Sequence, residues 1–314
     1  MRYVWIDTDT GVDDAAALIT AAGLQKSGYL KIMGVSTVFG NAEHEKTHEN
    51  ARNVLAALGL EEIPVYPGAK GPMLYGWKCA GYVHGINGVN EALLETSGAK
   101  RETMKAWDAL YECAGKCEGE LELILLGPET NAAVAFQKYP DLKNMLKRIL
   151  IMGGADVGGN VTPAAEFNIW ADADSAQCVF KSGVPVVMCG LDVTEKMYLT
   201  REELDRIEAG HGEGCCLFKK IIENEGGPFM KFYDGEPLLH DTVPLLFCVF
   251  PELFFGQEAG VFVETRGKIT RGKTVSDRET DVKFGTKNVF VVLDGDREAF
   301  AAKLAEMTEN AGQA

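Results

Sequence analysis

The stretch VWIDTDTGVDDAAAL, residues 4–18, decides the fold and holds the most unusual chemistry of this chain. Its apolar start predicts a short buried strand, and the small apolar residues from Ala15 onward predict the beginning of a helix. Between the two, within eight residues, stand four carboxylates: Asp7, Asp9, Asp13 and Asp14. In open α/β sheets, ligands bind at the carboxyl ends of the strands. We therefore expect these side chains to lie at a binding site.

Four carboxylates this close together repel one another unless some are protonated or a cation lies among them. A hard divalent cation with oxygen ligands meets this condition most simply. In the alternative interpretation, Asp13 and Asp14 stabilise the first helical turn through the helix dipole, while Asp7 and Asp9 are solvated loop residues. Because all four surround Gly11 at a single strand-to-helix turn, we favour the cation site.

The composition is that of an acidic globular protein. The chain has 314 residues, of which 46% are hydrophobic, and a net charge of −15, so nucleic acid and anionic membranes are disfavoured as main partners. Its eight cysteines contain no CxxC pair, which favours a reduced intracellular protein. The longest apolar stretch is interrupted by Pro251 and Glu252, so we expect no membrane span. A strand predicted at the very start leaves no room for a signal peptide, and we expect a cytoplasmic protein.

Strand-like apolar runs alternate with helical patterns along most of the chain. This order predicts an α/β fold, with a single domain over residues 1–314 and a Rossmann-like, open, mainly parallel sheet covered by helices on both faces. Strands are expected at residues 4–6, 32–39, 64–68, 121–126, 150–154, 184–188, 260–265 and 288–293. Helices are expected over residues 51–58, 173–181, 200–224, 243–249 and 297–307. One further helix is expected to begin at residue 15, and another is expected to follow the turn at residues 127–131 and run towards residue 139.

Two segments rich in glycine and aromatic residues break the alternation. Residues 70–90 lack periodicity, and loops of this length in compact domains are usually functional lids or disordered. Their aromatic content argues against simple disorder, so we expect a lid over the carboxylates, in which His84 either contacts the site or packs the loop. In the second segment, residues 229–235, the aromatic rings either fill the core or stack on a ligand. The histidines in polar stretches are expected at the surface: His44, His48 and His211.

Taken together, these pieces resemble the inosine-uridine preferring nucleoside hydrolases. The opening motif of that family has the form DxDxGxDD and reads DTDTGVDD at residues 7–14 here. Thr10 stands where the family usually has proline, a change that removes no metal ligand. The resemblance continues in the same order along nearly the whole chain, through residues 38–41 (VFGN), 84–85 (HG), 126–131 (LGPETN), 152–154 (MGG), 166–168 (EFN), 240–241 (HD) and 265–268 (TRGK).

The resemblance implies a calcium-dependent enzyme that splits ribonucleosides into ribose and a free nucleobase. By resemblance, Asp9, Asp14 and Asp241 bind Ca²⁺, with Asp14 bidentate, and the backbone carbonyl of Thr130 adds a further oxygen. Ribose hydroxyls and a water would complete a shell of six to eight oxygens, as Ca²⁺ prefers. The family also suggests a homo-oligomer, either a dimer or a tetramer.

The same resemblance assigns residues to the substrate. They fall into three groups: Asp13, Asn41 and Asn168 for the ribose hydroxyls; Met152, Asn160 and Glu166 for the 5′ side of the sugar; and Phe167 and His84 as further contacts. The preferred nucleobase does not follow from these residues.

Cleavage of a glycosidic bond needs an oxocarbenium-like sugar, an activated water and a leaving group made less basic. Coordination to a metal lowers the pKa of water. Asp9, a metal ligand beside that water, is the candidate general base. Water would attack opposite the base, so the enzyme would invert the configuration of the sugar. His240, which adjoins Asp241, is the candidate proton donor to the base.

Two other functions stay open at this point. A phosphohydrolase like the haloacid dehalogenase group would use Asp7 and Asp9 with Mg²⁺, although its pattern does not call for Asp13 and Asp14. A non-catalytic nucleoside-binding protein on the same scaffold is the second alternative. All the proposed metal and ribose residues are present, which argues against lost activity.

Overall fold

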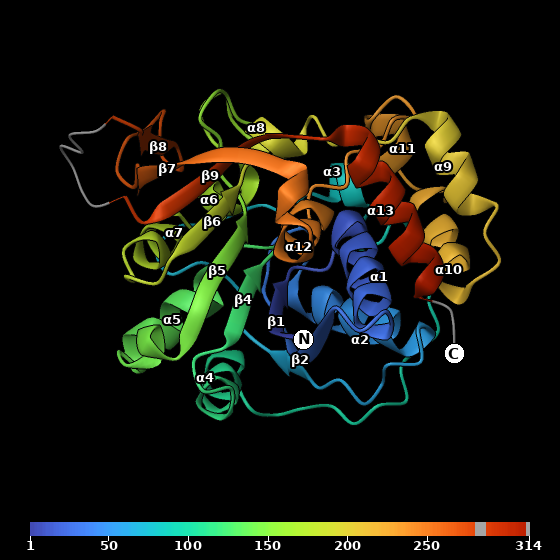
Figure 1. Ribbon diagram of the computed structural model, residues 1–314, viewed down its shortest axis with the longest axis horizontal. Helices are drawn as coiled ribbons and strands as arrows, with labels where there is room; N and C mark the ends of the chain where they lie inside the picture. The colour runs from blue at the N-terminus through green and yellow to red at the C-terminus, as the bar shows by residue number, and fades with distance from the viewer. Residues whose placement is uncertain (280–286, 312–314) are drawn as a thin grey trace.

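The computed structural model describes residues 1–279 and 287–311. One sheet with the strand order β3-β2-β1-β4-β5-β6-β9-β7-β8 forms its centre (Figure 1). Neighbouring strands from β3 across to β9 are parallel, while β7 is antiparallel to both β9 and β8. The prediction of an α/β fold with a mainly parallel sheet is therefore confirmed. The strands are β1 (Arg2–Thr8), β2 (Leu30–Thr37), β3 (Val65–Pro67), β4 (Leu121–Leu125), β5 (Leu146–Met152), β6 (Val186–Cys189), β7 (Phe254–Val263), β8 (Thr274–Asp277) and β9 (Val289–Gly295).

The sheet grows outward in both directions from β1 and β4. On one side β1 is followed by β2 and β3, and on the other side β4 is followed by β5 and β6. The winding of the chain thus reverses between β1 and β4, and such a switch point opens a crevice at the carboxyl ends of the strands. Asp7 and Thr8 end β1 at this edge. The fold therefore places the acidic motif at the mouth of the crevice.

Helices cover both faces of the sheet (Figure 1). This follows from the alternation of side chains along each strand: in β1, Val4 and Ile6 pack into one core and Trp5 packs into the other. The first core lies beneath α1 (Val12–Lys26), α2 (His44–Ala57), α10 (Glu213–Ile222), α12 (Thr242–Val249) and α13 (Arg297–Asn310), and the second beneath α4 (Ala106–Lys116), α5 (Thr130–Lys138) and α7 (Ala173–Phe180). Shorter helices are α3 (Gly81–His84), α6 (Phe167–Ala171), α8 (Leu191–Thr194), α9 (Arg201–Glu208) and α11 (Phe229–Phe232).

Helix α1 is packed on all sides. Every residue from Val12 to Leu24 is buried, because α2, α10, α12 and α13 surround the helix. Its many alanines and Gly23 let the neighbouring helices approach closely. A Cβ built on Gly23 would lie 1.8 Å from the backbone oxygen of Met307 in α13. This packing fixes the N-terminal turn of α1, which carries Asp13 and Asp14.

The structure differs from expectation in several elements. Residues 200–224 form two helices, α9 and α10, and α11 occupies part of the second aromatic segment. Strand β7 begins at Phe254 rather than near residue 260, because its first half is largely exposed and carries no alternating pattern. Helix α4 and strand β8 were not predicted. Within the described ranges, no helix is long and apolar enough to cross a membrane.

The prediction for two of the histidines was wrong. His44 and His48 are buried, and a ring nitrogen of each lies within 3.3 Å of the hydroxyl oxygen of Thr37. They are four residues apart on α2, and this spacing puts both on the inward face of the helix. The polar residues between them belong to its outer face. His211 is exposed, as expected.

We expect Gly23→Ala to destabilise the protein, because the added methyl group meets the carbonyl of Met307 unless α1 or α13 moves. Overpacking of this kind lowers the free energy of unfolding by about 1–3 kcal/mol. Gly115→Ala in α4 is the control, because a Cβ there meets no described atom within 4 Å. The control should raise the free energy of unfolding by about 0.4–1 kcal/mol. Urea unfolding compares the two variants, and equal stabilities would contradict the close helix contact.

Candidate active site

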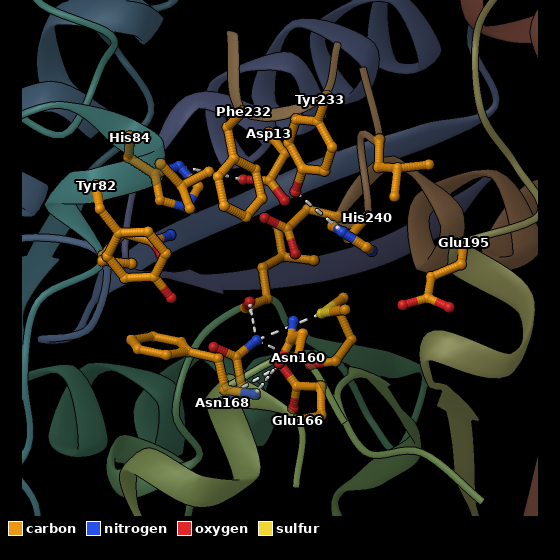
Figure 2. A pocket seen from close by; sticks show the side chains of 18 residues that line it. Asp13, Tyr82, His84, Asn160, Glu166, Asn168, Glu195, Phe232, Tyr233 and His240 are labelled. Carbon is orange, nitrogen blue, oxygen red and sulfur yellow. Dashed lines mark hydrogen bonds and ion pairs between the residues drawn. The ribbon is translucent and has the colours of Figure 1, made fainter. Parts of the chain in front are cut away.

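Most of the predicted site residues meet around one cavity of about 270 Å³ at the carboxyl edge of the sheet, although Asp9, Asp14 and Thr130 do not line it. Figure 2 shows Tyr82 and His84 on one side of it, His240 and Glu195 on the opposite side, and Asn160, Glu166 and Asn168 together at its lower wall. All eight residues predicted to bind substrate line this cavity, as do His240 and Asp241. The full lining is Asp13, Asn41, Ala80, Tyr82, Val83, His84, Leu126, Met152, Asn160, Glu166, Phe167, Asn168, Glu195, Phe232, Tyr233, Leu238, His240 and Asp241.

Asp9 is fully buried between two glycines. A Cβ on Gly40 would lie 1.9 Å from Asp9 Oδ2, and a Cβ on Gly127 would lie 2.6 Å from Oδ1. Oδ2 accepts a hydrogen bond of 2.7 Å from the backbone N–H of Asn41. Oδ1 has no hydrogen-bond partner in the described part of the chain. One oxygen of this carboxylate is therefore held rigidly, and the other is free to bind a ligand.

Asp14 is held by several donors at the N-terminus of α1. Its Oδ1 accepts from the Thr8 hydroxyl, and its Oδ2 accepts from the Gly11 N–H and the Asn41 side-chain amide, each at 2.9 Å. Asp14 thus also caps the helix, as the structural interpretation of the sequence suggested. The same contacts fix the orientation of its carboxylate.

Three carboxylates converge beside the cavity. Oxygen atoms of Asp13, Asp14 and Asp241 lie within 4.8 Å of one another, and all three residues are buried. Burial, reinforced by the neighbouring negative charges, raises the pKa of Asp13, Asp241 and Asp9 well above the usual carboxyl value. The cavity lining, drawn from the described residues, contains no Lys or Arg. A buried group of carboxylates without a compensating side-chain cation fits a hard metal ion.

Thr130 does not line the cavity, and its hydroxyl donates to Asp172 at 2.7 Å. Leu126, which directly follows β4, lines the cavity instead, and its carbonyl accepts from the Asn168 side-chain amide at 2.8 Å. That amide also donates to the carbonyl of Met152 at 3.1 Å. Because both bonds use its nitrogen, the amide oxygen of Asn168 stays available to a ligand.

Glu166 caps α6 from the wall of the cavity. Its carboxylate accepts from the backbone N–H groups of Asn168, Gly154 and Ile169 at 2.8–3.2 Å. Burial nevertheless raises the pKa of Glu166 to about 7. Asn160 is held by the Phe167 N–H, which donates to its side-chain oxygen at 2.9 Å. These contacts orient polar groups at one end of the cavity.

Two buried histidines face the cavity in neutral form at pH 7. Burial lowers the pKa of His84 to about 3 and that of His240 to about 4. His84 Nδ1 accepts from the Val12 N–H at 3.1 Å, which places the ring proton on Nε2. His240 Nδ1 lies 2.8 Å from the Thr194 hydroxyl, and its Nε2 lies 3.4 Å from the Tyr233 hydroxyl. Either ring can donate one N–H without being an imidazolium.

Sequence reasoning did not assign the aromatic wall of the cavity. Tyr82 and Phe232 meet edge to face at 5.9 Å between ring centres, and Phe232 and Tyr233 meet at 4.9 Å. They come from the two glycine- and aromatic-rich segments. The sequence left Phe229, Phe232 and Tyr233 open between core packing and stacking on a ligand, and it did not single out Tyr82; Phe232 and Tyr233 line the cavity, whereas Phe229 is buried outside it. Glu195 follows α8 and lines the cavity without any pattern that would have identified it.

Stability of the metal-free protein should fall as pH rises. Burial raises the pKa of Asp7 and Glu166 to about 7, so the stability that their protonation provides is complete below about pH 4 and is lost as pH rises through about 7. Between its pKa in the unfolded chain and its pKa in the folded protein, each group lowers the free energy of unfolding by up to about 1.4 kcal/mol per pH unit. Thermal unfolding in EDTA from pH 5 to 8 measures the trend, and Glu166→Gln should make it shallower. A rise in stability over this range would contradict the burial of these acids.

Comparison with known proteins agrees with the site. The model of the family described as inosine-uridine preferring nucleoside hydrolase matches residues 4–302. A pyrimidine-specific ribonucleoside hydrolase RihA of Shewanella woodyi is 34% identical over 98% of each chain. Among solved structures, a purine-preferring ribonucleoside hydrolase from Gardnerella vaginalis has a TM-score of 0.91 at 29% identity over 100% of both chains. A plant nucleoside hydrolase, PpNRh1, has a TM-score of 0.89 at 29% identity over 98% of this chain and 99% of its own. The chain therefore belongs to the inosine-uridine preferring nucleoside hydrolase family.

Proposed function

We propose that the protein hydrolyses the N-glycosidic bond of ribonucleosides with a calcium ion held by Asp9, Asp14 and Asp241. The observation that carries the choice of a hard cation is the group of buried carboxylates Asp13, Asp14 and Asp241 at a cavity whose described lining has no Lys or Arg. Asp9 is not part of that group and is proposed from the family resemblance and from its unpaired Oδ1. The available ligands are oxygens, which suits Ca²⁺. As the further backbone ligand we propose the carbonyl of Leu126 in place of Thr130, because Leu126 lines the cavity and the residue after it, Gly127, packs against Asp9.

When bound, the ion supplies positive charge that orients the ribose hydroxyls and lowers the pKa of a neighbouring water. Asp9 is the general base, since its Oδ1 has no other partner among the described residues. Asp13 and the amide oxygen of Asn168 accept hydrogen bonds from the ribose hydroxyls, and Asn41 stands beside them. The side-chain amides of Asn41 and Asn168 are already fixed by their own hydrogen bonds, so little ordering of these groups is needed when substrate binds.

The remaining lining residues orient the rest of the nucleoside. We assign Glu166, Asn160, Met152 and Phe167 to the 5′ side of the sugar. His84 donates to the substrate from Nε2, while its acceptor nitrogen Nδ1 lies 3.7 Å from Asp13 Oδ1.

The rings of Tyr82, Phe232 and Tyr233 offer apolar surface for a nucleobase, and His240 approaches the base with its Nε2. Because His240 is neutral at pH 7, we revise its role from proton donor to donor of a hydrogen bond. Neutral imidazoles act in this way in other enzymes.

The phosphohydrolase alternative has little support. Asp7 would be its nucleophile, yet Asp7 does not line the cavity and its Oδ2 accepts from Ser36 and Asn131. Phosphate esters are anionic, and the cavity wall bears the carboxylates of Asp13, Glu166, Glu195 and Asp241. Like charges in a partly buried site oppose binding of such a substrate. Homo-oligomerisation and a cytoplasmic location stay predictions from the sequence.

Because the proposed ligands form a single site, purified protein should contain about one calcium ion per chain. Asp241→Asn should lose the ion, because one of three proposed carboxylate ligands becomes a neutral amide. Glu195→Gln is the matched control, since it removes a charge from the same cavity wall outside the proposed ligand group and should keep the ion. Elemental analysis after gel filtration measures the content. Stoichiometric zinc, or retention of calcium by Asp241→Asn, would reject the proposed ligand set.

Ribonucleosides should be strongly preferred over 2′-deoxyribonucleosides. Loss of the 2′-hydroxyl leaves Asp13 and a cation coordination position without their partner, and sites built around a substrate hydroxyl reject analogues lacking it by roughly 10⁴- to 10⁵-fold. The greater intrinsic lability of deoxynucleosides opposes this effect without cancelling it. The measurement is kcat/KM for uridine over 2′-deoxyuridine and for inosine over 2′-deoxyinosine. Ratios near one for both pairs would exclude recognition of the ribose by these groups.

A further inference from the structure

Thr194 lies at the end of α8, directly behind His240. Its hydroxyl oxygen is 2.8 Å from His240 Nδ1, and this is the only hydrogen bond of that hydroxyl among the described residues. Thr194 is 1% exposed and does not line the cavity. No substrate group and no cavity water can therefore serve as an alternative partner for it.

The other ring nitrogen of His240 has a different environment. Nε2 lies 3.4 Å from the Tyr233 hydroxyl, a longer contact than the one to Thr194. Tyr233 itself lines the cavity, as Figure 2 shows, so its hydroxyl can also bond to water or to a ligand. Only the Nδ1 side of the ring has a single, enclosed partner.

A neutral imidazole carries its proton on one nitrogen and accepts at the other. A proton on Nδ1, in the neutral ring or in an imidazolium, would donate to Thr194, and the buried threonine hydroxyl would then have no acceptor among the described residues for its own proton. If the proton is on Nε2, the threonine hydroxyl donates to Nδ1 and every buried donor on that side is paired. Unpaired buried donors are strongly disfavoured, so the second arrangement is the stable one.

We propose that Thr194 is a positioning residue that holds His240 in the tautomer with its proton on Nε2, aimed at the leaving base. As the bond between C1′ and the base nitrogen breaks, its electron pair passes to the base. At the same time the water oxygen bonds to C1′ and its proton passes to Asp9. The His240 N–H stabilises the charge on the base by a hydrogen bond, no proton leaves the ring, and the base anion takes its proton from solvent water. The inference rests on the proposed role of His240 in nucleoside hydrolysis.

Thr194→Val removes the hydroxyl but keeps the shape of the side chain, and Thr194→Ser keeps the hydroxyl. In calcium-loaded enzyme, the valine variant should lose roughly 10- to 100-fold in kcat for uridine, as seen when partners that orient a histidine are removed. KM should change little, because Thr194 does not touch substrate. Serine should restore most of the rate.

A second substrate separates positioning from general damage. 4-Nitrophenyl β-D-ribofuranoside uses the same ribose groups but releases a stable phenolate that needs no hydrogen bond from His240. Its kcat should stay near the wild-type value in Thr194→Val. An equal loss with both substrates, or no loss with uridine, would overturn the inference.

The tautomer itself can be observed without turnover. Long-range ¹H–¹⁵N spectra of the histidine rings, assigned by comparison with His240→Ala, should show Nε2–H in the wild type and a mixture in Thr194→Val. A wild-type ring protonated on Nδ1 would contradict the proposal directly. Failure of the proposed function looks different: uridine is then not hydrolysed at all, or His240→Ala leaves its kcat unchanged.

Discussion

Repulsion among the buried carboxylates at the end of β1 is the constraint on which the rest of the structure depends. The hydrogen-bond partners of these acids differ from one acid to the next. Asp7 is held by Ser36 and Asn131, and Asp14 by three donors around the first turn of α1. Asp7, Asp9 and Asp13 nevertheless each keep one buried oxygen with no partner in the described ranges. Of these three residues only Asp13 lines the cavity, where it meets Asp14 and Asp241.

The local parts of this arrangement could be predicted from the sequence because they are contiguous. A strand, a turn with Gly11 and a helix follow one another within fifteen residues, and each has its own pattern. The reversal of winding between β1 and β4 was not predicted, because the alternation of strands and helices does not determine the order of strands in the sheet. The resemblance to a family then identified most residues of the cavity wall, although they are far apart in the chain.

The parts that could not be predicted depend on how distant segments meet. Thr130 and Leu126 belong to one short motif, and which of them faces the cavity depends on where α5 begins. His44 and His48 have polar neighbours in sequence, yet their common helix face is buried against Thr37. The contact between Thr194 and His240 joins α8 to the start of α12, and no pattern in either segment indicates it.

The cavity wall is built from different parts of the fold. Asp13 and Asp241 stand at the starts of α1 and α12, which are packed into the core, so a small displacement there disturbs many contacts. Tyr82 and Phe232 stand on two short helices outside the sheet. Substitutions on these short helices can therefore accumulate while the carboxylates are kept. In a family with such a cavity, the preferred nucleobase can change while the residues that bind and cleave the sugar stay the same. The relatives of this chain include hydrolases named for pyrimidines and for purines.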